Sequence, residues 1–212
     1  MRARCLGDAA ARYLRRMPRA PRLEVEDGIF HVATRSNIHR VAYGDDRDRA
    51  LFLKVLESLL LRYGWECHAY CLMTTHYHLV IRTRRPTLAT GMQLLNGHFA
   101  RIFNCRRGER SHVFGGRYFS KQVTSEAQLI ATLRYIALNP VAAGICKRAT
   151  EWPWSSYSAW VTSGRRPSLL AAPLLNDLDD TRAVAWLRTV VEPVEGMAAL
   201  AGSSSLNGAR HS

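Results

Sequence analysis

Residues 65–83 of the chain read WECHAYCLMTTHYHLVIRT, and they carry the clearest indication of secondary structure. Apolar, aromatic and β-branched residues dominate 65–72 and 76–83, as is typical of strands. The short segment between them, Met73-Thr74-Thr75, fits the connection of a hairpin. The stretch therefore predicts two strands that are adjacent in the chain and paired in a sheet.

His76 and His78 are the chemically informative residues of the second strand. Successive side chains of a strand point to opposite faces, so both imidazoles project to the same side, about 7 Å apart. Two imidazoles at this spacing can share one divalent metal ion if a third ligand comes from elsewhere in the chain. Alternatively, they are two polar residues on the solvent face of a half-buried strand.

Outside this hairpin, the chain predicts further strands and helices. Ile29–Arg35 alternates apolar and polar residues and is expected to form a strand. A helix is expected over 47–63, with Asp45 and Asp46 as candidate caps and Gly64 at its end. The other expected elements are a helix from Pro86 to about Asn104, a strand at 117–123, a helix at 126–138 between Ser125 and Pro140, and one more helix at 179–191.

This order, βαββαβ followed by further helices, is that of the ferredoxin-like and RRM-like folds. We expect an α+β domain with a four-stranded antiparallel sheet, helices on one face and the other face bare for a ligand. The predicted units are a basic arm at 1–22, the main domain at 23–160, a C-terminal helical extension at 161–195 and a disordered tail at 196–212. The arm is rich in arginine, so it also resembles a transit peptide; we favour a third interpretation, in which Met17 is the true start.

Composition points to a polyanionic partner. The chain of 212 residues carries 30 Lys and Arg against 17 Asp and Glu, a net charge of +13. This balance favours nucleic acid or an anionic surface, and a metal ion held on such a protein suggests phosphate chemistry on nucleic acid. No apolar run is long enough for a membrane span. The five cysteines are odd in number and form no C-x-x-C pair, which favours a reducing cytoplasm over a disulfide framework.

The helix at 126–138 and its exit supply further candidates. Tyr135 and Asn139 are four residues apart and share one helix face. A tyrosine hydroxyl is a weak nucleophile unless it is activated, and a metal ion that polarises a phosphate lowers the cost of its attack. Asn139 could reach the same ion through its side-chain oxygen. Alternatively, Tyr135 packs in the core and Asn139 merely caps the helix before Pro140.

Four segments resemble those of a known family, in the same order and spacing. Residues 69–79 (AYCLMTTHYHL) resemble the HUH motif of single-strand-specific tyrosine transposases. Residues 134–144 (RYIALNPVAAG) resemble their nucleophile helix and its exit, and 114–118 (FGGRY) and 154–157 (WSSY) also match. Together they make the chain similar to the REP-associated tyrosine transposases, a branch of the IS200-like transposase family.

The resemblance implies a reaction and its residues. His76, His78 and Asn139 would bind a Mg²⁺ or Mn²⁺ ion, and Tyr135 would be the nucleophile. The protein would cut single-stranded DNA beside a folded hairpin, retain the 5′-phosphate on the tyrosine and release a 3′-hydroxyl, in DNA transposition. It would act as a monomer or homodimer near the nucleoid, with no membrane partner. Thr75, Ser36 and Ala142 stand where relatives usually have Asn, Gly and Arg, and none of these departures removes a ligand or the nucleophile.

Polar and aromatic residues around these motifs are expected to contact DNA, mainly through its phosphates. The alternative for each basic residue is a solvated surface charge. The candidates are Arg35, Asn37, Arg40, Arg82, Arg84, Arg101, Arg117 and Tyr118, with Phe119 as a second ring for stacking. For at least one of the two rings, core packing is the favoured alternative.

Two rival functions remain. One is a regulatory protein that binds hairpin DNA and has no catalytic activity. The other is an RRM-like RNA-binding module, which would need aromatic residues on the two central strands, where this chain carries histidines.

Overall fold

The computed structural model describes residues 25–37, 41–171 and 178–192. Within them, four strands form one sheet in the order β2-β3-β1-β4, and every neighbouring pair is antiparallel. The strands are β1 (Gly28–Arg35), β2 (Glu66–Leu72), β3 (His76–Thr83) and β4 (Phe119–Val123). The predicted α+β class and the predicted hairpin of β2 and β3 are therefore confirmed.

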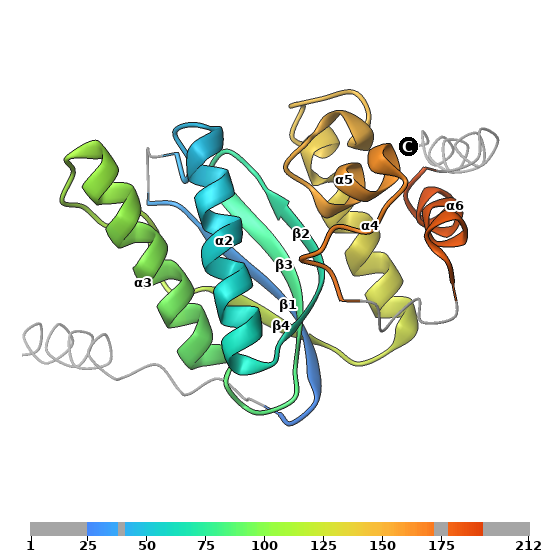
Figure 1. Ribbon diagram of the computed structural model, residues 1–212, viewed down its shortest axis with the longest axis horizontal. Coiled ribbons are helices and arrows are strands. Elements are labelled where there is room, and N and C mark those ends of the chain that lie inside the picture. The colour runs from blue at the N-terminus through green and yellow to red at the C-terminus, as the bar shows by residue number, and fades with distance from the viewer. Residues whose placement is uncertain (1–24, 38–40, 172–177, 193–212) are drawn as a thin grey trace, which may run out of the picture.

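The two crossover helices cover one face of the sheet, as predicted. These are α2 (Asp46–Tyr63) and α3 (Leu88–Arg107), which lie together over the sheet in Figure 1. The Asp45 side chain caps α2 by accepting from the Asp48 amide at 2.9 Å, and Gly64, with φ 63°, ends it. The core on this side is rich in aromatic rings, among them Phe52, Tyr77 and Phe99.

The opposite face, predicted to be bare, is partly covered by α4 (Glu126–Ala142). Leu129, Leu133 and Ile136 recur at helical spacing and pack in a second, smaller core with Val80 of β3. These apolar residues need a partner surface, and the outward side of β2 and β3 supplies it. The part of this face formed by β1 and β4 lies beside α4 and holds two surface pockets.

Pro140 does not stop the helix, contrary to the prediction. It lies inside α4, which runs on to Ala142 before Gly144 takes a left-handed conformation at φ 68°. A proline in the last turn removes one amide donor but can still accept hydrogen bonds. The Ile145 amide donates to the Pro140 carbonyl and the Ala143 amide to the Asn139 carbonyl, both at 2.9 Å. Asn139 is therefore held in helical geometry.

The C-terminal part covers one end of the β2 edge of the sheet. The Leu72 amide donates to the Trp154 carbonyl, and the Tyr70 amide donates to the Ser156 hydroxyl, which itself donates to the Tyr70 carbonyl. Segment 154–156 thus partners β2 and leads into α5 (Ser156–Ser163), a helix that the sequence did not predict and that crosses the predicted boundary at 160/161. A short 3-10 helix, η1 (Ala149–Glu151), precedes it, and α6 (Asp180–Val191) follows close to its predicted position.

Several predicted features lie outside the described residues: the arm at 1–22, Arg40 and the tail at 196–212. Among the helices that are described, none has the length and apolar character required to cross a membrane.

Asp48 ties α2 to the end of α3. Its side chain is fully buried and accepts hydrogen bonds from Arg106, Arg107 and the Gly44 amide. We expect Asp48→Ala to destabilise the fold by about 2 kcal/mol, because it removes the buried partner of two guanidinium groups and leaves them only the more exposed Asp45 carboxylate, at 3.5 and 3.7 Å. Urea unfolding would measure this. Asp46→Ala is the matched control, since that carboxylate is 75% exposed and its loss should change stability by less than about 0.5 kcal/mol. Equal effects of the two substitutions would contradict the role given to Asp48.

Candidate active site

The two histidines of β3 project from the sheet on the side opposite to α2 and α3. Between them, Tyr77 points the other way into the main core and is fully buried. The His76 and His78 ring centroids are 5.0 Å apart, with the ring planes at 89°. His78 is only 6% exposed, so the interpretation of both residues as solvated polar side chains does not hold.

Helix α4 brings the other two candidates to the same place. Asn139 Oδ1 lies 3.3 Å from His76 Nε2, and the Tyr135 ring centroid lies 5.4 Å from that of His78. Tyr135 is 52% exposed, so it is not a core residue, and Asn139 is inside the helix rather than at its cap. Four residues predicted from two distant segments of the chain therefore converge.

His31 of β1 is a fifth member of this cluster, and sequence reasoning missed it. Its Nε2 lies 3.0 Å from His78 Nδ1, and the two ring centroids are 5.2 Å apart. It also meets the Tyr135 ring edge-on at 5.9 Å. The alternation in Ile29–Arg35 already places His31 on the face away from the core. The missing information was that β1 pairs with β3, with His31 opposite Val80.

The environment keeps these imidazoles neutral. Burial, with smaller contributions from His76, His31 and Arg35, lowers the pKa of His78 to about 3. Burial also lowers the pKa of His76 and of His31. Only a deprotonated ring nitrogen can bind a metal ion, so a depressed pKa leaves these nitrogens available at neutral pH without competition from protons.

The donor atoms fit a divalent ion. His78 Nε2 is buried and has no hydrogen-bond partner among the described residues. Neighbouring ligands of an octahedral ion with bonds of 2.0–2.1 Å lie about 3 Å apart, close to the 3.3 Å between His76 Nε2 and Asn139 Oδ1. No group of three or more His, Cys, Asp or Glu side chains that could hold a metal ion occurs in the described residues. A third protein ligand at this place would therefore be the Asn139 amide.

Two surface pockets flank Tyr135 and share it as a wall together with Phe119. One contains the histidine pair, with Arg35 and Arg117 at its rim. The other lies between β4 and α4 and is lined by His31, Lys121, Gln128 and Thr132 among others. A polyanionic strand passing over Tyr135 would thus meet a cation on either side.

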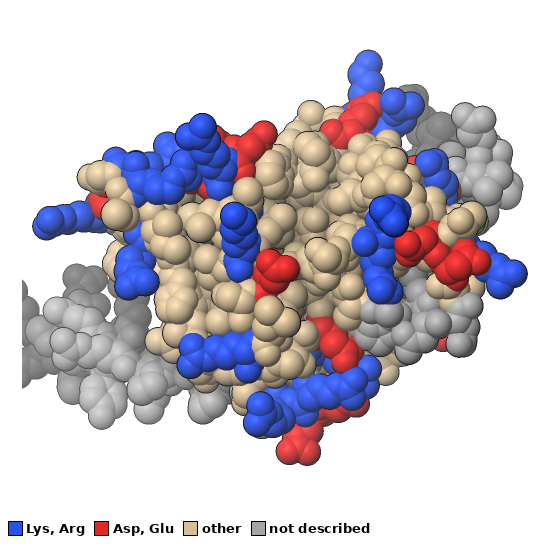
Figure 2. Space-filling view, viewed as in Figure 1, with Lys and Arg blue, Asp and Glu red and all other residues tan. Residues whose placement is uncertain are grey.

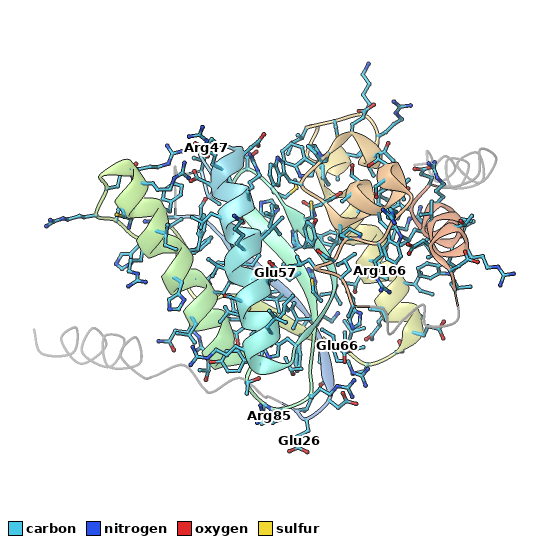
Figure 3. The ribbon with its side chains drawn as sticks, in the orientation of Figure 1. Glu26, Arg47, Glu57, Glu66, Arg85 and Arg166 are labelled. Atoms are coloured by element: carbon cyan, nitrogen blue, oxygen red, sulfur yellow. The ribbon has the colours of Figure 1, made fainter. Side chains whose placement is uncertain are left out.

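The remaining DNA candidates are spread over the molecule. Arg82 and Arg84 lie at the far end of β3, where both pair with Glu66, labelled in Figure 3, and Arg82 also pairs with Asp27. Arg101 lies on α3, across the sheet from the site. On the face shown in Figure 2, acidic side chains lie beside many of the Lys and Arg residues, so the basic charge is interrupted there.

Of the two neighbouring aromatic residues considered for base stacking, one packs in the core and the other is exposed. Tyr118 is only 7% exposed and belongs to the main core, so its ring is not available to stack on a base. Phe119 is 52% exposed and lines both pockets beside Tyr135. Asn37 lies just beyond β1, where its backbone N–H donates to the Val113 carbonyl at 2.9 Å.

Comparisons with solved structures find likenesses at low sequence identity. A REP-associated tyrosine transposase bound to a REP hairpin is 16% identical, with a TM-score of 0.59 over 73% of this chain and 92% of that one. A proposed transposase from Deinococcus radiodurans R1 is 17% identical, with a TM-score of 0.40 over 56% of this chain and 95% of that one. The tRNA(His) guanylyltransferase of Saccharomyces cerevisiae is 10% identical, with a TM-score of 0.43 over 82% and 76%. The first likeness shows the fold alone, and the other two are too distant to carry an argument.

A search of curated proteins finds no match to the chain. The comparison with protein families is more specific. The family described as "Transposase IS200 like" matches residues 24–139, which include β1 to β4 and α4 as far as Asn139. The match covers more than half of the chain and contains all five residues of the cluster. The chain therefore belongs to the IS200-like transposase family.

Proposed function

We propose that this protein is a metal-dependent endonuclease and strand transferase for single-stranded DNA. In this proposal it cuts beside hairpin DNA and forms a 5′-phosphotyrosine intermediate. The observation that carries the proposal is the convergence of His76, His78 and Asn139 with an exposed phenol, Tyr135, on one face of the sheet. The solved relative bound to a REP hairpin supports the choice of a hairpin substrate.

The proposed chemistry is a transesterification at phosphorus. The Tyr135 oxygen attacks the scissile phosphate, the bond to the 3′-oxygen breaks, and the 5′-phosphate stays on the tyrosine. His76, His78 and Asn139 would hold a divalent ion, which when bound would supply Lewis-acid polarisation of that phosphate. Arg35 and Arg117, at the rim of the same pocket, bind flanking phosphates and offset the charge that develops. Attack by a 3′-hydroxyl on the phosphotyrosine reverses the step, so rejoining needs no ATP.

Phe119 and Lys121 extend the proposed DNA path along β4. Phe119 offers an exposed ring for base stacking, which tolerates any sequence. Lys121 lines the pocket on the other side of Tyr135 from Arg35 and can contact the backbone. We assign Arg82 and Arg84 a smaller part in cleavage than the sequence suggested, because their ion pairs lie at the opposite end of β3.

Removing one oxygen tests the nucleophile. We expect Tyr135→Phe to bind hairpin single-stranded DNA like the wild type and to form no covalent adduct with it in the presence of Mn²⁺. A denaturing gel with end-labelled DNA would show the adduct as a slowly migrating band. Tyr63→Phe, at the end of α2, is the matched control and should form the adduct normally. An adduct with Tyr135→Phe would show that the nucleophile is another residue. A wild type that binds the hairpin but never forms an adduct would instead support the silent regulatory protein.

Substitution of Asn139 tests the proposed ion site. Asn139→Ala removes an oxygen donor, and we expect at least about a 10-fold loss of Mn²⁺ affinity, in the range seen when groups around a metal are removed. Asn139→Asp keeps an oxygen at the same place and should bind Mn²⁺ at least as tightly as the wild type. Isothermal titration calorimetry without DNA would measure both. Wild-type affinity in Asn139→Ala would remove this residue from the site, and cleavage that continues in excess EDTA would remove the ion from the mechanism.

A further inference from the structure

We propose that His31 is a positioning residue that holds the His78 imidazole in the tautomer and orientation needed to bind the ion. This inference rests on the proposed function of the site. It concerns a residue on β1, outside the segments that carry the proposed ligands and the nucleophile. The observation behind it is the pairing of His31 Nε2 with His78 Nδ1 at 3.0 Å, together with the unpartnered His78 Nε2.

The tautomer that metal binding requires determines the direction of this hydrogen bond. A neutral imidazole carries one proton, so one ring nitrogen donates and the other accepts. If His78 Nε2 is to bind an ion it must be unprotonated, and the proton must then sit on Nδ1. His78 Nδ1–H therefore donates to His31 Nε2, and His31 carries its own proton on Nδ1. Ligand histidines commonly donate their second ring nitrogen to such an acceptor, which fixes the tautomer and the ring orientation.

The backbone holds His31 in place for this role. β1 pairs with β3 along its whole length, with His31 opposite Val80 and Ala33 opposite His78. His31 and His78 are therefore diagonal neighbours on the same face, within reach of each other's rings. The two ring planes are inclined by 29°, and the Phe119 ring of β4 lies edge-on to His31, with centroids 5.9 Å apart. His31 thus has little freedom to turn away from His78.

The same ring also touches the proposed nucleophile. Tyr135 contacts both His31 and His78 edge-on, at centroid distances of 5.9 and 5.4 Å. His31 consequently fills the space behind the proposed ion site and beside the phenol. Without it, the buried His78 Nδ1–H would lose its acceptor, and the ring could change its tautomer or turn. Either change would take Nε2 away from the position in which it faces the site.

The test compares two substitutions in the full-length chain, each on the Tyr135→Phe background so that cleavage does not interfere. His31→Leu removes the acceptor, and we expect Mn²⁺ affinity to fall by about 10- to 100-fold. His31→Gln keeps an acceptor oxygen and should recover most of that loss. His98→Leu, on α3 across the sheet, is the control and should leave affinity unchanged. Calorimetry gives the affinities, and thermal unfolding shows whether each variant is folded.

A second measurement needs neither a variant nor an ion. Long-range ¹H–¹⁵N correlation spectra of the histidine side chains report which nitrogen of each ring carries the proton. We expect His78 to be protonated on Nδ1 in the wild type. A wild-type His78 protonated on Nε2 would overturn the inference, as would Mn²⁺ affinity that is unchanged in folded His31→Leu, or a His31→Gln that is as weak as His31→Leu.

The outcomes separate this inference from the proposed function. Normal Mn²⁺ binding and a normal tyrosine adduct, together with an inert His31→Leu, would overturn only the role of His31. Loss of Mn²⁺ affinity in His31→Leu, with no adduct ever formed by Tyr135, would support the role of His31 and overturn the strand-cutting function. A wild type that binds no Mn²⁺ even with hairpin single-stranded DNA present would overturn both.

Discussion

Strand β3 contributes side chains to the hydrophobic cores on both faces of the sheet. The geometry of the site depends on which residues point to which face. Tyr77, Leu79 and Ile81 point into the main core, whereas His76, His78 and Val80 point to the opposite side. The register is fixed by a fully buried Tyr77, whose hydroxyl donates to Asn96 at 2.6 Å and accepts from Thr34 at 2.8 Å. A slip by one residue would bury both imidazoles among aromatic rings and expose Tyr77. The cost of that exchange keeps the two histidines on the face opposite to the main core.

Helix α4 adds Tyr135 and Asn139 to the two histidines and so completes the cluster. Leu133 and Ile136 pack against the outward side of β3, and this contact sets the rotation of the helix. Tyr135, between them in sequence, must then lie at the rim of the contact, and Asn139 follows one turn later on the same side. Because the helix continues through Pro140, Asn139 keeps its helical direction and reaches His76. Packing of apolar residues therefore determines where the polar ones meet.

Local periodicity was enough to predict part of this arrangement. The alternation of strands placed His76 and His78 together, and the helical repeat did the same for Tyr135 and Asn139. His31 could not be found in this way, because its partner is set by which strand lies beside β1, a property of the whole sheet. Tyr118 and Phe119 were not separable either, since a strand of five residues has too few positions to fix its phase against the core. The edge contact of Ser155 and Ser156 with β2 is likewise long-range in sequence.

The charge of the cluster follows from its residue types. His76, His78 and Asn139 are all neutral donors, and the residues that line the surrounding pocket include Arg35 and Arg117 but no carboxylate. An ion held there in the proposed function would keep its full charge of two, and the nearby guanidinium groups would oppose its binding. A phosphate of the substrate offsets that repulsion and can itself contribute oxygen ligands. Ion and DNA should therefore each favour the binding of the other, because the protein alone supplies only part of the charge and part of the coordination.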